Sequence, residues 1–121
     1  MIRRRPLARL LRRLLPGALP RLGAARVAGR SMTPTLLDGD RLLLRYGAAA
    51  RPGRLVVVRL PGRGLSVKRA AFAVPEGWWV ERDNPAEGVD SWLVGAIAPQ
   101  DVVAVVLFRY WPLRRAPRPR T

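Results

Sequence analysis

The sequence predicts a mainly β protein, built as one compact antiparallel β-domain. From residue 27 onward, short runs rich in valine, leucine and aromatic residues alternate with turns that contain glycine, proline or asparagine. No segment after residue 25 shows the apolar spacing of a helix. The chain has 121 residues, 49% of them hydrophobic, which is enough for one domain with a modest core.

Six segments are expected to form the strands of this domain, and each is bounded by turn residues. In chain order they are 41–46, 54–60, 65–74, 77–82, 92–97 and 101–111. The connections "GAAARPG", "PGRG", "VPEG" and "DNPAEG" supply the residues that chain reversals require. We therefore expect the β-domain to cover residues 27–112.

The two ends of the chain are expected to lie outside this domain. Residues 1–26 carry four leucines at helical spacing with arginines between them. This pattern predicts either a short basic amphipathic helix on an anionic membrane surface or a disordered arm. Arginines interrupt every apolar run, so this arm is not expected to span a bilayer. Residues 113–121 are typical of a disordered tail rich in proline and arginine.

The composition excludes several classes of catalytic site. There is no histidine and no cysteine, which removes Ser-His-Asp triads, thiolate nucleophiles and metal sites built on those residues. We expect no metal and no other cofactor. The formal net charge of +15 favours polyanionic partners. Many arginines lie near the two ends, however, which indicates basic arms rather than a basic binding face.

Lys68 is the only lysine among 23 basic residues. The alternation of a strand places Ser66 and Lys68 on one face. If that face points inward, desolvation lowers the pKa of the lysine, and a neutral amine can accept a proton from a serine hydroxyl. Arginine cannot do this, because its guanidinium stays protonated in proteins. The alternative is an ordinary exposed lysine.

Ser31 is the serine that such a base could serve. It stands in "VAGRSMTPTLLDGD", where Gly29 and Pro34 predict a bent loop that presents a hydroxyl and backbone N–H groups. A serine between glycine and proline is more often a plain turn residue. The sequence alone leaves both interpretations open.

Four segments resemble, in order, the motif boxes of the type I signal peptidase family of serine proteases. They are "GRSMTPTLLDGDRLL", "RPGRLVVVRLPG", "VKRA" and "GWWVERDNPAEGVDSWLVGAI", and the resemblance covers about residues 27–112. It implies a β-domain of the signal peptidase/LexA-like kind and a serine endopeptidase with a Ser-Lys dyad. The small size, "GWWVERDNP" and the closing "RYWP" most resemble nickel-type superoxide dismutase maturation proteases. That subgroup implies removal of an N-terminal leader from a precursor protein, the nickel superoxide dismutase precursor.

The resemblance also assigns roles to residues of the first and third boxes. Ser31 would be the nucleophile and Lys68 the general base. The main-chain N–H of Ser31 would be one oxyanion donor, with Gly29 at the place where some relatives supply a second donor. Met32 would line the substrate groove.

The last box departs from the family pattern. The residues that match it and would have structural roles are Asp83, Asn84, Asp90 and Ser91. Relatives can use a serine of this box to orient the lysine, but Gly88 stands there, and Ser66 is a candidate substitute. The family's arginine is replaced by Trp92, which would remove an ion-pair partner of one of the aspartates.

Three other functions stay open. One is a generic processing enzyme of the signal peptidase kind. Another is a basic nucleic-acid-binding module with stacking tryptophans, which is not favoured because the four tryptophans lie in strand-like runs. The third is the related Ser-Lys fold of self-cleaving repressors, which ranks last because no helix-turn-helix pattern precedes the core. We expect a precursor protein as partner and a cytoplasmic location, with peripheral contact of the basic arm at the inner membrane face.

Overall fold

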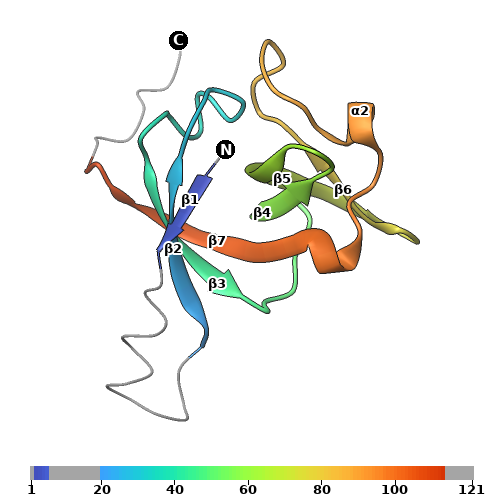
Figure 1. Cartoon of the computed structure of the whole chain (residues 1–121), viewed down its shortest axis with the longest axis horizontal. Helices are drawn as coiled ribbons and strands as arrows, with labels where there is room; N and C mark the ends of the chain where they lie inside the picture. The colour runs from blue at the N-terminus through green and yellow to red at the C-terminus, as the bar shows by residue number, and fades with distance from the viewer. Residues whose placement is uncertain (1, 6–19, 114–121) are drawn as a thin grey trace.

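The structure, a computed structural model, describes residues 2–5 and 20–113 and contains one antiparallel sheet of seven strands (Figure 1). The order across the sheet is β1-β2-β3-β7-β4-β5-β6. The strands are β1 (Ile2–Arg5), β2 (Leu22–Val27), β3 (Arg41–Tyr46), β4 (Leu55–Leu60), β5 (Gly64–Val74), β6 (Gly77–Glu81) and β7 (Val102–Trp111). A short helix α2 (Ser91–Val94) and a 3-10 turn η1 (Pro99–Asp101) connect β6 to β7. The mainly antiparallel β fold expected from the sequence is confirmed.

Five of the six predicted strands are present, with ends that agree within one residue. They are β3, β4, β5, β6 and β7. In each case, alternating or continuous apolar residues end at glycine, proline or a polar turn, so local sequence is enough to define the strand.

The strand predicted over 92–97 is wrong. Residues Ser91–Val94 form α2 instead, because the Asp90 side chain accepts a hydrogen bond from the Trp92 N–H and caps the helix. Gly95 ends the helix with φ of +82°. Only Ile97 joins the sheet, through an isolated bridge to Trp78. The apolar side chain of Trp92 is 73% exposed, so this run does not supply a core strand.

The sheet begins before the boundary expected at residue 27. β2 contains Ala24 and Ala25, both buried, and β1 pairs antiparallel with it. The residues expected to form a basic arm thus contribute strands at both of their described ends. Gly23 is needed here, because a Cβ at that position would lie 2.5 Å from the Tyr46 ring. The amphipathic helix predicted within the arm falls in 6–19, outside the described residues, as does most of the predicted tail.

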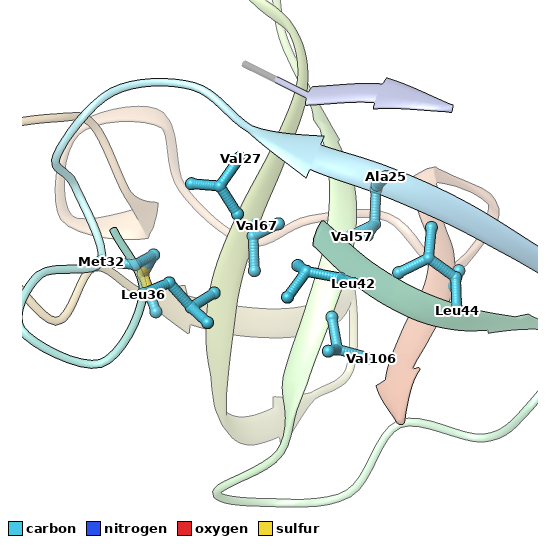
Figure 2. Packing of buried hydrophobic residues seen from close by; sticks show 10 residues of the cluster. Ala25, Val27, Met32, Leu36, Leu42, Leu44, Val57, Val67 and Val106 are labelled. Carbon is cyan, nitrogen blue, oxygen red and sulfur yellow. The ribbon is translucent and has the colours of Figure 1, made fainter. Parts of the chain in front are cut away.

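Two apolar clusters occupy opposite faces of the central strands. Val57 and Ala104 belong to the first cluster, which also contains Met32 and Leu36 from the loop after β2 (Figure 2). Their neighbours Val56, Val58 and Val105 belong to the second cluster. Because both faces of β4 and β7 are covered at their centres, residues 56–58 and 102–106 form continuous apolar runs rather than alternating patterns.

Within the described part of the chain, no helix is long and apolar enough to cross a membrane.

Candidate active site

Ser31 lies in the loop between β2 and β3, and its neighbour anchors that loop to the core. Met32 is 2% exposed and packs in the first apolar cluster, where Figure 2 shows it beside Leu36. The Leu36 N–H donates to the Met32 carbonyl over 2.9 Å, which closes one turn of the loop. The loop that carries Ser31 has no regular secondary structure, but the packing of Met32 in the core holds it in place.

Asn84 holds the same loop from the opposite side. Its side-chain amide donates to the Arg30 carbonyl over 2.9 Å and to Thr33 Oγ1 over 3.0 Å. Its backbone N–H donates to the Ser31 carbonyl over 2.8 Å. Three hydrogen bonds from one residue thus restrain the backbone on both sides of the serine.

Lys68 lies in β5, opposite Val56 of β4, and is 1% exposed. Its Nζ donates a hydrogen bond to Ser31 Oγ over 3.0 Å. Burial lowers the pKa of this lysine from 10.5 to about 8. The nearby charge of Asp90 raises the pKa and partly opposes the burial, whereas the charge of Arg82 lowers it further. The amine can therefore exist in its neutral form close to neutral pH.

An open pocket of about 260 Å³ contains both side chains. Its walls come from three segments: residues 28–31 of the loop, residues 60–68 around the turn between β4 and β5, and residues 87–89 before α2. A ligand that enters from solvent can thus reach Ser31, while Lys68 borders the pocket as an almost fully buried side chain.

Gly29 lines this pocket, but its backbone N–H is already engaged. It donates to Asp38 Oδ1 over 2.9 Å. Gly29 has φ of +94°, which favours glycine, and a Cβ there would meet nothing within 4 Å. Among the residues that the structure describes, no hydrogen bond occupies the N–H of Ser31, which leaves that group available to a ligand.

Gly88 packs directly against Ser31. A Cβ at position 88 would lie 2.5 Å from the Ser31 Cβ and 3.6 Å from its Oγ, and the φ of Gly88 is +97°. From the family resemblance, a glycine at this position means the loss of an orienting hydroxyl. In this structure the position has no room for a side chain, so the glycine has a steric reason of its own.

Ser66 shares the face of Lys68, since both pair with alternate residues of β4. It is 7% exposed and lines the same pocket. The hydrogen bond of Lys68 Nζ goes to Ser31, and no bond joins it to Ser66 within 2–5 and 20–113.

Asp83 forms a bidentate ion pair with Arg69, the residue after the lysine. The two nitrogen–oxygen distances are 2.9 and 2.6 Å, and Thr35 Oγ1 donates to the same carboxylate over 2.5 Å. Burial by itself would raise the pKa of Asp83, but the hydrogen bonds from Arg69 and Thr35 and the charge of Arg69 lower it below the ordinary value. This pair joins β5 to the loop that carries Asn84.

Asp90 and Ser91 support the end of the same loop. The carboxylate of Asp90 is 3.7 Å from Arg82 Nη1, and it accepts a hydrogen bond from the Arg82 N–H over 3.1 Å. Ser91 Oγ accepts from the Val80 N–H over 2.8 Å.

Two arginines replace the partner that Trp92 was expected to remove. Arg69 pairs with Asp83 and Arg82 pairs with Asp90. The one sign of them in the sequence is that both arginines lie within the matched motif boxes, in "VKRA" and "GWWVERDNP". In the described ranges, no group of three or more carboxylates is placed to hold a metal ion.

The comparisons with known proteins agree with this geometry. A family model described as Peptidase S24-like matches residues 11–95, a range that contains Ser31, Lys68 and the whole pocket. No curated protein matches the sequence. The matched range exceeds half of the 121 residues. On this evidence the chain belongs to the Peptidase S24-like family, within the S24/LexA-like superfamily, and its function is that of a serine peptidase-like protein.

Proposed function

We propose that this protein is a serine endopeptidase in which Ser31 is the nucleophile and Lys68 the general base. The observation that carries the proposal is the 3.0 Å contact between Ser31 Oγ and the Nζ of a lysine that is 1% exposed. Exposed lysines have no reason to lose their proton at neutral pH. Here burial lowers the pKa to about 8, which brings the neutral amine within reach.

The first half of the proposed reaction forms an acyl-enzyme. When Lys68 is neutral, the direction of its hydrogen bond with Ser31 is reversed, and the Ser31 hydroxyl donates to the amine nitrogen. The amine then accepts this hydroxyl proton. The oxygen attacks the scissile carbonyl carbon, and the N–H of Ser31 stabilises the negative charge that develops on the carbonyl oxygen. When the C–N bond breaks, Lys68 returns its proton to the leaving amine, and the acyl group stays on Ser31.

The second half restores the free enzyme. Lys68 takes a proton from a water molecule, and the resulting hydroxide attacks the ester carbonyl. The bond to Ser31 Oγ then breaks, the oxygen regains the proton from Lys68, and the carboxylic acid product leaves. Each proton moves between atoms that the pocket holds together, so no metal or cofactor is needed.

We further propose that the enzyme is of the signal peptidase type and removes the leader of a precursor protein. The support is the ordered resemblance of the four motif boxes and the open pocket at the serine. The resemblance names the nickel superoxide dismutase precursor as the first substrate to test. Incubation of the full chain with that precursor, followed by mass spectrometry of its N-terminus, should reveal a shortened product. Cleavage of a generic signal peptide without cleavage of this precursor would contradict the subgroup assignment.

The dyad itself is tested by Lys68→Arg. The variant keeps a positive charge but cannot accept a proton, so we expect the rate of peptide cleavage to fall at least about 10³-fold. Arg59→Lys is the matched control, because Arg59 is exposed and pairs with Asp101 outside the pocket. Circular dichroism checks that each variant is folded. If Lys68→Arg cleaves as fast as the parent, Lys68 is not the base.

A further inference from the structure

Three charged residues line the pocket of Ser31 and Lys68, and each comes from a different wall. Arg30 precedes the serine, Arg63 lies in the turn between β4 and β5, and Glu87 lies in the loop before α2. All three are exposed. The charged groups thus lie on the path of any peptide that approaches the serine.

The two arginines of this pocket differ from those that support the fold. Arg69 and Arg82 each pair with a carboxylate. Within 2–5 and 20–113, Arg30 and Arg63 form hydrogen bonds only through backbone atoms, and neither belongs to an ion pair. An unpaired guanidinium presents several N–H donors, and a carboxylate matches their fork geometry.

We propose that this pocket binds peptides with acidic side chains next to the scissile bond, and that Arg30 and Arg63 recognise those side chains. The proposal rests on the proposed peptidase function, because it assigns a substrate class to the same site. A glutamate or aspartate near the scissile bond would reach the guanidinium of Arg30 or Arg63. The apolar lining residues Leu60 and Leu65 would contact neutral parts of the peptide and would not distinguish acidic from basic substrates.

Glu87 is the one carboxylate in the lining, and it works in the opposite direction. Arg30 and Arg63 outnumber it, so the lining of the pocket has a net charge of +1 without Lys68. The whole chain has a formal net charge of +15, which also attracts acidic segments and repels basic ones. The local and the overall charge therefore favour the same class of peptide.

Binding can be measured separately from catalysis with the full-length Ser31→Ala variant. Three fluorescein-labelled decapeptides are compared by fluorescence anisotropy. They carry a central Ala-Ala pair and are identical except that the two residues flanking this pair, one on each side, are both glutamate, both glutamine or both lysine. We expect the glutamate peptide to bind roughly tenfold more tightly than the glutamine peptide, and the lysine peptide to bind most weakly. In Arg30→Glu/Arg63→Glu, added to Ser31→Ala, the order should reverse.

Arg45→Glu/Arg51→Glu is the matched control. It changes the net charge by the same amount, but both arginines line a different hollow that shares no residue with the pocket of Ser31. If the control reverses the preference equally, the effect belongs to the overall charge and the proposal is wrong. Equal binding of all three peptides to Ser31→Ala also overturns it. The milder Arg30→Gln/Arg63→Gln should abolish the preference without reversing it.

The peptidase proposal is decided by a different measurement, which is cleavage of the same peptides by the parent protein. Cleavage without any preference for glutamate would overturn only the substrate class. Tight, arginine-dependent binding of the glutamate peptide without cleavage would support the acidic subsite and contradict the peptidase proposal.

Discussion

Replacing Gly88 by serine should lower the activity about 10²-fold, although relatives can carry a serine at the matching position. In this structure a Cβ at position 88 would lie 2.5 Å from the Ser31 Cβ, whereas ordinary contacts begin at 3.4 Å. The shortfall is 3.4 − 2.5 = 0.9 Å. The atom that it meets is the first side-chain atom of Ser31 rather than the end of a flexible chain. The loop that carries Ser31, or the loop that carries Gly88, must therefore move.

The size of the effect follows from that displacement. If Ser31 moves away by about 1 Å, its distance to Lys68 Nζ grows from 3.0 Å to about 4 Å, beyond hydrogen-bond range. A misplacement of about 1 Å in a catalytic group can lower the rate roughly 10²-fold. Overpacking adds about 1–3 kcal/mol of destabilisation. A side chain at φ of +97° adds about 1–2 kcal/mol.

The assay is a comparison of kcat with the thermal unfolding midpoint. Gly53→Ser separates the two costs, because Gly53 has φ of +85° but a Cβ there meets nothing within 4 Å. We expect both variants to unfold at a lower temperature, and only Gly88→Ser to lose about 10²-fold in kcat. Parental kcat in Gly88→Ser would refute the steric argument. It would mean that this fold accepts a serine at position 88.

Four further results are expected. The value of kcat/KM should rise about tenfold per pH unit below about 8 and level off above it, because neutral Lys68 is the active form; a flat profile across this range would exclude it as the base. Lys68→Met should be inactive, yet its free energy of unfolding at pH 7, measured by chemical denaturation, should exceed that of the parent by about 3 kcal/mol. The reason is that the pKa of Lys68 is about 8 in the folded protein and 10.5 in the unfolded chain, so the charged lysine destabilises the fold at low pH. The gain should vanish as the pH rises from 8 to 10.5. Asp90→Asn should move the midpoint of the pH–rate profile downward and Arg82→Gln should move it upward, because their charges act on Lys68 in opposite directions; shifts of the same sign would contradict this. Asn84→Ala should lower the free energy of unfolding by about 1–3 kcal/mol and reduce kcat, because the carbonyl of Arg30 loses its donor; an unchanged kcat would show that the loop of Ser31 does not need this restraint.

The strands could be predicted from the sequence where local pattern alone defines them. β3 agrees with its predicted range of 41–46 at both ends, and β4 and β5 agree within one residue. Each is bounded by glycine or proline; β3 and β4 have leucine- or valine-rich interiors, and β5 is a longer run that ends in small apolar and aromatic residues. Such signals do not depend on what the strand packs against.

Two elements were not predicted, β2 because packing overrides its propensity and α2 because an apolar run hid its helix cap. β2 has the sequence "LGAARV", whose glycine and alanines disfavour strands in general. They are needed here because the ring of Tyr46 covers Gly23, and both alanines are buried. In "SWLVGAI" the apolar run resembles a strand, but the cap from Asp90 and the turn at Gly95 select a helix.

The candidate site also has a part that the sequence suggests and a part that only the structure shows. Lys68 stood out because a single lysine among arginines suggested a function that arginine cannot perform, and the family resemblance paired it with Ser31. The contacts that position them join segments far apart in the chain, such as Thr35 with Asp83, and Asn84 with Arg30. A single sequence contains no signal for such pairs.

If Ser31 and Lys68 act as proposed, the departures in the last motif box change which of the two residues is held in place. In relatives a serine hydroxyl of this box can orient the lysine. Here the corresponding loop acts on the nucleophile, since the Asn84 N–H binds the Ser31 carbonyl and Gly88 packs against the Ser31 Cβ. The lysine needs less help, because strand pairing and near-complete burial already fix its position. We infer that precise placement of Ser31 against a rigid Lys68 replaces the usual orientation of the lysine, so activity should be more sensitive to changes at Gly88 and Asn84 than to loss of the Ser66 hydroxyl.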